Sequence, residues 1–180
     1  MISINLTDSV KRYKNESDNK KKKRALWNES VKQLLIDTIS KIVSTHAIGW
    51  SMELIGSSTN VEGVTLTFGD IIIGVEPTHK EPITENTKAN AENIEVKYYT
   101  KHEGTLAFTQ AYNGDIFIII VYPTIEEIIN PRDTQKLEMR IDPSRITTEF
   151  IEHQVAKFLD EIVKWESSPL YNDIGFVVKR

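Results

Sequence analysis

Residues 106–121 read LAFTQAYNGDIFIIIV and predict a β-hairpin. Apolar and polar side chains mix along the first arm, whereas the second arm, Ile116–Val121, is apolar at every position. Asn113-Gly114 lies between the arms and favours a type I′ turn, because both residues tolerate positive φ. A strand that is apolar on both faces belongs inside a sheet. We therefore expect an antiparallel sheet with Ile116–Val121 near its centre.

Further strands are expected on both sides of this hairpin, where apolar residues recur with a period of two. They cover residues 50–55, 64–68, 71–75, 94–99 and 137–141. We expect them to follow one another as a meander, in a mostly antiparallel sheet of about six strands. Residues 78–92 are polar and contain Pro82, and they predict a long exposed loop.

Two helices are expected to flank the sheet in the sequence, because their apolar residues recur at spacings of three and four. The first should begin near Ala25 and end near His46, and the second should begin at an N-cap at Thr147 or Thr148. Their apolar stripes are Trp27, Val31, Leu34, Leu35, Thr38, Ile39, Ile42 and Val43 in the first helix, and Phe150, Ile151, Val155, Phe158, Leu159, Ile162 and Val163 in the second. Two striped helices and a sheet predict a two-layer α+β domain, with an N-terminal helix and a long C-terminal helix.

Positive charge gathers at the N-terminus. Residues 1–30 hold eight Lys or Arg against four Asp or Glu, a balance of +4, so the rest of the chain, with 14 against 22, carries −8. Most of the excess is the run Lys20, Lys21, Lys22, Lys23 and Arg24. We expect residues 1–24 to form a flexible basic arm and residues 25–180 to form a single α+β domain, because the arm lacks a sustained apolar pattern. Within the arm, Val10 and Tyr13 allow a short helix from Asp8 to Lys14. The run is typical either of a patch that binds phosphate groups or of a solvated tail that keeps the chain soluble.

The composition is that of an ordinary globular chain, with 39% hydrophobic residues, 27% charged residues and a net charge of −4. Cysteine is absent, which excludes disulfides and thiolate chemistry. The longest apolar run is far shorter than the ~20 residues of a membrane span. The four histidines lack the spacing of metal ligands, and no phosphate-binding or nucleotide-binding glycine motif is present. We expect a cytoplasmic protein without membrane attachment and without a cofactor.

One set of residues resembles the signature of the PD-(D/E)xK nuclease superfamily. Asp70 opens one expected strand, and Glu95-x-Lys97 lies on a later one. The resemblance implies that Asp70 and Glu95 hold Mg²⁺, with Glu76 as a third carboxylate, and that Lys97 supports the attacking water or the developing charge. Oxygen ligands of this kind suit a hard cation. The same Glu-x-Lys pattern is also produced by any solvent-facing sheet surface.

The first functional hypothesis is a non-catalytic binding or accessory module. Its partner is expected to be a protein, bound through a sheet edge, the 78–92 loop or the N-terminal arm. A metal-dependent nuclease using Asp70, Glu95 and Lys97 with Mg²⁺ is the alternative, and its nucleic acid would be recruited by the basic arm. A small-ligand pocket between the sheet and the C-terminal helix is a third option. Self-association is also allowed.

Overall fold

A computed structural model describes residues 5–47, 50–56, 62–68, 72–79, 94–125, 135–167 and 175–177 of the 180-residue chain. The fold is α+β, as the sequence predicts. Its helices are α1 (Leu6–Leu26), the π-helical turn η1 (Trp27–Val31), α2 (Lys32–His46), the short 3₁₀ turn η2 (Pro143–Arg145) and α3 (Thr148–Glu166).

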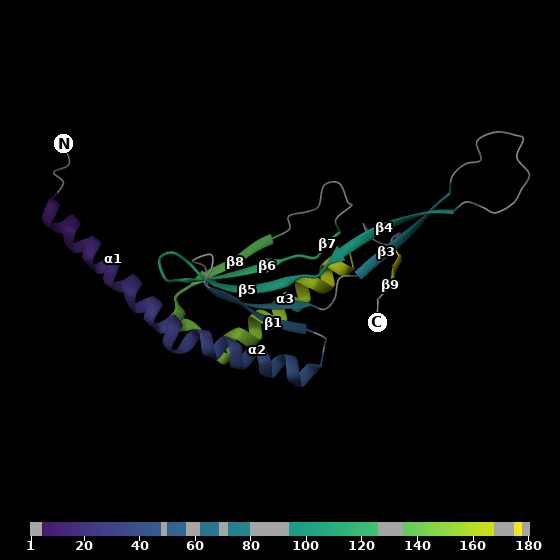
Figure 1. The fold of residues 1–180 in the computed structure, drawn as a ribbon. Helices are drawn as coiled ribbons and strands as arrows, with labels where there is room; N and C mark the ends of the chain where they lie inside the picture. The colour runs from purple at the N-terminus through teal and green to yellow at the C-terminus, as the bar shows by residue number, and fades with distance from the viewer. Residues whose placement is uncertain are drawn as a thin grey trace, which may run out of the picture.

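The strands form two antiparallel sheets (Figure 1). The larger sheet has the order β1-β2-β5-β6-β8, and the smaller one has the order β7-β4-β3-β9. In chain order the strands are β1 (Trp50–Ile55), β2 (Gly63–Phe68), β3 (Ile72–His79), β4 (Ile94–His102), β5 (Thr105–Gln110), β6 (Ile116–Val121), β7 (Thr124–Ile125), β8 (Gln135–Ile141) and β9 (Gly175–Val177).

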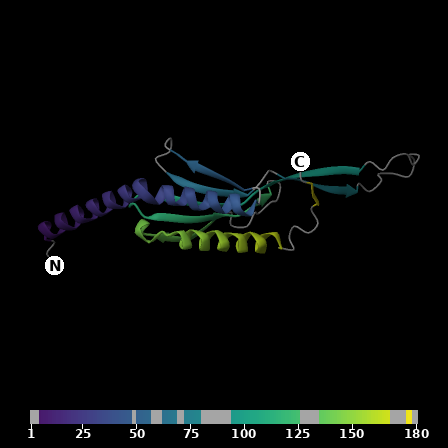
Figure 2. The same ribbon diagram turned by 90° about the horizontal axis from the view of Figure 1, so that it is seen from below.

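The core lies between one face of the larger sheet and the helices α2 and α3, which run side by side beneath it (Figures 1 and 2). Strand register aligns the buried side chains into rows, as in Leu66–Leu106–Ile120 across three neighbouring strands. The helices contribute residues such as Leu35 and Phe158, and both are fully buried. This packing confirms the two-layer arrangement of a striped helix pair on a sheet.

The strands 72–79 and 94–102 belong to the smaller sheet and interrupt the meander that the sequence predicted. After β2 the chain enters β3, which pairs with β4 from Ile72↔Lys101 to His79↔Ile94, and β4 then leads back to β5 beside β2. The larger sheet therefore has five strands, and β3 and β4 extend from one end of the domain. Strand β6 lies between β5 and β8, inside the sheet as expected.

The turn of the β5–β6 hairpin differs from the expected type I′ geometry. The Gly114 N–H donates to the Ala111 carbonyl at 2.9 Å, and the Ala111 N–H donates to the Asp115 carbonyl at 2.8 Å. Of the two turn residues, only Gly114 has positive φ, at 87°. This is the three-residue loop in which a type I turn ends in a left-handed glycine. The hairpin is confirmed, but the expected pair of positive φ angles is wrong.

The first helix begins at Leu6 rather than near Ala25, so this expectation is also wrong. Asn5 caps the helix, since its side chain accepts a hydrogen bond from the Thr7 N–H at 3.1 Å. No glycine or proline interrupts the segment, and Lys23 and Arg24 in the last turn suit the helix dipole. Figure 1 shows α1 extending beyond the sheet and continuing through η1 into α2. The division of the chain after residue 24 stays a prediction.

Candidate protein-binding surface on the N-terminal helix

Helix α1 has 21 residues, and none of them is buried. It is attached to the domain at its C-terminal end, where η1 widens the helix by a backbone bond from the Lys32 N–H to the Trp27 carbonyl. Trp27 and Val31, four residues apart, are both buried in the core. Such π-helical turns realign the faces of a helix. The projecting helix and the core helix α2 therefore form one continuous rod.

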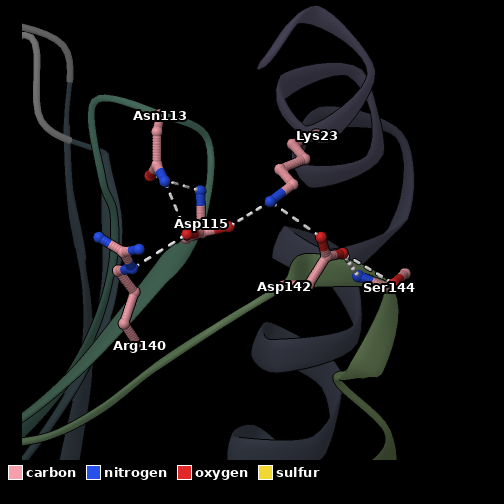
Figure 3. Close-up of polar contacts among 6 residues, drawn as sticks. All are labelled: Lys23, Asn113, Asp115, Arg140, Asp142 and Ser144. Carbon is pink, nitrogen blue, oxygen red and sulfur yellow. Dashed lines mark hydrogen bonds and ion pairs between the residues drawn. The ribbon is translucent and has the colours of Figure 1, made fainter. Parts of the chain in front are cut away.

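A polar cluster, which we call the Lys23 junction, fixes the base of α1 (Figure 3). Lys23 Nζ lies 2.5 Å from Asp115 Oδ1 and 2.9 Å from Asp142 Oδ2. Asp115 also accepts a hydrogen bond from Asn113 at 2.7 Å and lies 3.1 Å from Arg140 Nε. The side chains of Lys23 and Asp115 are only 17% and 10% exposed. The junction thus joins α1 to the β5–β6 turn and to the segment after β8.

The charges at the junction stabilise one another, and their pKa values shift accordingly. Hydrogen bonds to Asp115 and Asp142 raise the pKa of Lys23. Burial acts to raise the pKa of Asp115, but the hydrogen bonds from Lys23 and Asn113 outweigh it and the net shift is downward. Hydrogen bonds from Ser144, together with the Lys23 ammonium, lower the pKa of Asp142 from 3.8 to about 2.

These shifts predict how stability depends on pH. A carboxyl group with a lowered pKa stabilises the fold above its unfolded pKa, and this contribution is lost as pH falls through the folded value. We expect the free energy of unfolding to fall between about pH 4 and pH 2, and part of this fall should be absent in Asp142→Asn. Urea denaturation of both proteins across that range measures the difference. Identical pH profiles would show that Asp142 is not coupled to folding.

Close approach between α1 and the hairpin turn depends on Gly114. A Cβ atom added there would lie 2.7 Å from the Lys23 Cβ and 3.2 Å from the Lys20 carbonyl oxygen. Its φ of 87° is also unfavourable for residues with a side chain. Glycine is therefore required here both for the conformation of the turn and for the close packing of α1 against it.

A hollow of about 310 Å³ lies beside the junction, between α1 and the β5–β6 turn. We call it the notch, and its lining includes Tyr13, Glu16, Ser17, Lys20, Tyr112 and Asn113. Tyr112 is 83% exposed, and Lys20 Nζ lies 3.3 Å from the centroid of its ring. A hydrogen bond from the Lys20 ammonium lowers the pKa of Tyr112. The notch thus offers an aromatic wall next to a cation.

Three large apolar side chains along α1 are exposed to solvent. Leu6, Val10 and Tyr13 are 74%, 44% and 75% exposed, and they recur at spacings of four and three. These spacings place them on one side of the helix. A helical stripe of this kind is normally buried against another element.

A second hollow, of about 300 Å³, lies where α2, α3 and the start of β1 meet. Its lining is mostly apolar and includes Ile42, Trp50, Val155 and Leu159, with His46 and Glu152 as polar members. It lies beside the C-terminal helix, where the sequence left a small-ligand pocket open.

Lys101 is a buried cation at the other end of the sheet. It forms a short ion pair with Glu166, lies 3.8 Å from Glu103 Oε1, and lies 5.4 Å from the ring centroid of Trp165. Burial raises the pKa of Glu103, and the Lys101 charge opposes this shift. The contacts link the end of β4 to the end of α3, which is a structural role.

The residues of the nuclease hypothesis lie mainly on the smaller sheet. Glu76 is the register partner of Lys97, and Glu95 is the register partner of Thr78. Asp70 lies outside the described residues, as does the 78–92 loop beyond His79. Within the described ranges, no group of three His, Asp or Glu could hold a metal ion. The convergence of Asp70 and Glu95, which only the nuclease alternative requires, is therefore not tested by the described residues.

The basic run is divided by the structure into residues with different contacts. Lys20 stacks on Tyr112, Lys23 is held in the junction, and Lys21 lies 3.8 Å from Asp18. Lys22 and Arg24 have exposed side chains. Sequence reasoning missed Asp115, Asp142 and Tyr112 as partners of this run. The only local signal was the position of Asp115 directly after Asn113-Gly114, which places it beside a tight turn.

Neither a protein-family model, a curated protein sequence nor a solved structure matches this chain. Among the described helices, none combines the length and the apolar content that crossing a bilayer requires.

Proposed function

We propose that this chain is a non-catalytic binding module for a protein partner, and that α1 makes the contact. The observation that supports the proposal is an ordered helix of 21 residues that has no fully buried residue and exposes Leu6, Val10 and Tyr13. Most of the stability of helices in proteins comes from packing of an apolar face against another element. An anchored helix with an exposed apolar stripe is typical of a surface that packs against another molecule.

The sheet edges are less suited to this role. The edge strands of the larger sheet are β1 and β8. Both carry exposed charged residues, Glu53 on β1 and Lys136 and Arg140 on β8. Charges on an edge strand discourage the addition of another strand. Of the surfaces that the sequence offered, α1 is therefore the one that we select.

Site-specific photo-crosslinking in the native host tests the proposal. A photoreactive residue at Val10 should capture a protein partner, because Val10 lies within the exposed stripe. The same residue at Lys22, an exposed position about a third of a turn around α1 from Val10 and outside the stripe, is the matched control. Capture at Glu53 of β1 but not at Val10 would assign the contact to the sheet edge. Capture at none of these positions would overturn the proposal.

A further inference from the structure

One side of α1 is free of acidic residues. At 3.6 residues per turn, eight residues fall within about a third of the helix circumference. We call this side the basic apolar face, and it consists of Leu6, Val10, Tyr13, Lys14, Ser17, Lys20, Lys21 and Arg24. The three acidic residues of α1, Asp8, Glu16 and Asp18, all lie outside it. The face therefore combines an apolar outer half with a cationic inner half.

We propose that the partner contributes an acidic amphipathic helix that packs lengthwise along the basic apolar face. This inference rests on the proposed function. Its apolar side chains would cover Leu6, Val10 and Tyr13, and its carboxylates would face Lys14, Lys21 and Arg24. Opposite charges across an interface fix the register of two helices and speed their association. The face itself carries no acidic side chain, and Glu16 lines only the adjoining notch, so a basic partner would meet mostly like charges along the face.

The notch favours a protein helix over a bilayer or a nucleic acid. Tyr13, Ser17 and Lys20 belong to the face and also line the notch, so the two are continuous. A flat lipid surface cannot fill a hollow of about 310 Å³, whereas a side chain from a partner helix can. Phosphates would gain nothing from Leu6 and Val10 at the outer end of the helix. The combination of stripe, cations and notch matches a second helix.

A synthetic peptide as long as α1, with leucines on one face and glutamates flanking them, is the probe for this inference. Isothermal titration with the full chain should show binding that weakens as salt is raised, because exposed charges are screened. Lys14→Glu with Lys21→Glu should lower the affinity about tenfold or more. The matched control, Lys11→Glu with Lys22→Glu, has the same net charge but alters residues outside the basic apolar face, and it should retain most of the affinity.

A second variant separates the apolar contribution from the charges. Val10→Ala with Tyr13→Ala should also weaken binding of the probe peptide. Alanine favours helix, so this loss cannot come from melting of α1. Circular dichroism of each variant checks that the helix content is retained.

Several outcomes would overturn the inference. The first is that the unmodified chain does not bind the peptide. The second is that the test and control charge reversals lower the affinity for the peptide equally. The third is that this face binds anionic vesicles or duplex DNA while the peptide fails to bind. A protein captured at Val10 together with no affinity for the acidic peptide would leave the proposed function in place and remove only this partner chemistry.

Discussion

Replacing Trp27 with alanine is expected to lower the free energy of unfolding by about 3–5 kcal/mol, the range for loss of a large aromatic side chain from a core. The indole is fully buried at the start of η1. Its Nε1–H donates to Glu62 Oε2 at 3.1 Å, and that carboxylate also lies 3.5 Å from Lys32 Nζ. The hydrogen bond from Trp27 lowers the pKa of Glu62. The substitution therefore removes core packing and a polar link at the same point.

The conservative variant Trp27→Phe separates these two contributions. It keeps an aromatic ring in the core but removes the hydrogen bond, so a loss of about 1 kcal/mol is expected from that bond. Urea denaturation followed by circular dichroism measures both variants without relying on the fluorescence of Trp27. A loss below about 1 kcal/mol in Trp27→Ala would contradict the packing of the rod at η1. Because domains are stable by only about 5–15 kcal/mol, the alanine variant should be visibly destabilised.

The helices of the core could be predicted from sequence because their signals are local. Thr147 is the N-cap of α3, with its hydroxyl accepting a hydrogen bond from the Phe150 N–H at 3.2 Å, as the capping pattern indicated. The apolar spacing of α2 likewise predicted its end at His46. Each of these features depends on residues within one or two turns of one another. Hydrophobic periodicity and capping preferences are sufficient for such elements.

The sheet shows where local signals stop being informative. Period-two alternation predicts a strand equally well in either sheet, so it could not show that Ile72–His79 pairs with Ile94–His102 outside the larger sheet. The turn at Asn113-Gly114 has the composition of a type I′ turn. A loop one residue longer, which ends at Gly114, forms instead and packs against α1. In both places a tertiary neighbour decides the outcome.

Most of the N-terminal helix was missed for the same reason. Its residues show only a weak apolar stripe, and its attachment depends on Lys23 meeting Asp115, a partner 92 positions away in the chain. Nothing in the local sequence reports that contact. A basic run without periodicity is typical of a solvated segment, whereas here two of its lysines are held by the domain. The candidate surface could therefore be recognised only after the fold was known.

Replacing Lys23 with methionine is expected to cost about 2 kcal/mol, since it leaves two carboxylates near each other without their shared cation. The cost should lie below the 3–5 kcal/mol typical of a broken buried pair, because Arg140 still contacts Asp115 and Asp142 is more than a third exposed. The amides of α1 should also exchange faster with solvent than in the unmodified chain, because the helix loses its fixed base. Urea denaturation and hydrogen exchange measure the two effects.

The neighbouring variant Lys22→Met is the matched control, because Lys22 has an exposed side chain one position away. It should change stability by less than about 0.5 kcal/mol and leave exchange in α1 unaltered. In a double-mutant cycle, adding Asp142→Asn to Lys23→Met should cost less than Asp142→Asn alone, since the ion pair is already absent. Additive losses would show that Lys23 and Asp142 act independently. Unchanged exchange in Lys23→Met would mean that η1 alone orients α1, and the projecting face would then owe its position to Trp27 and not to the junction.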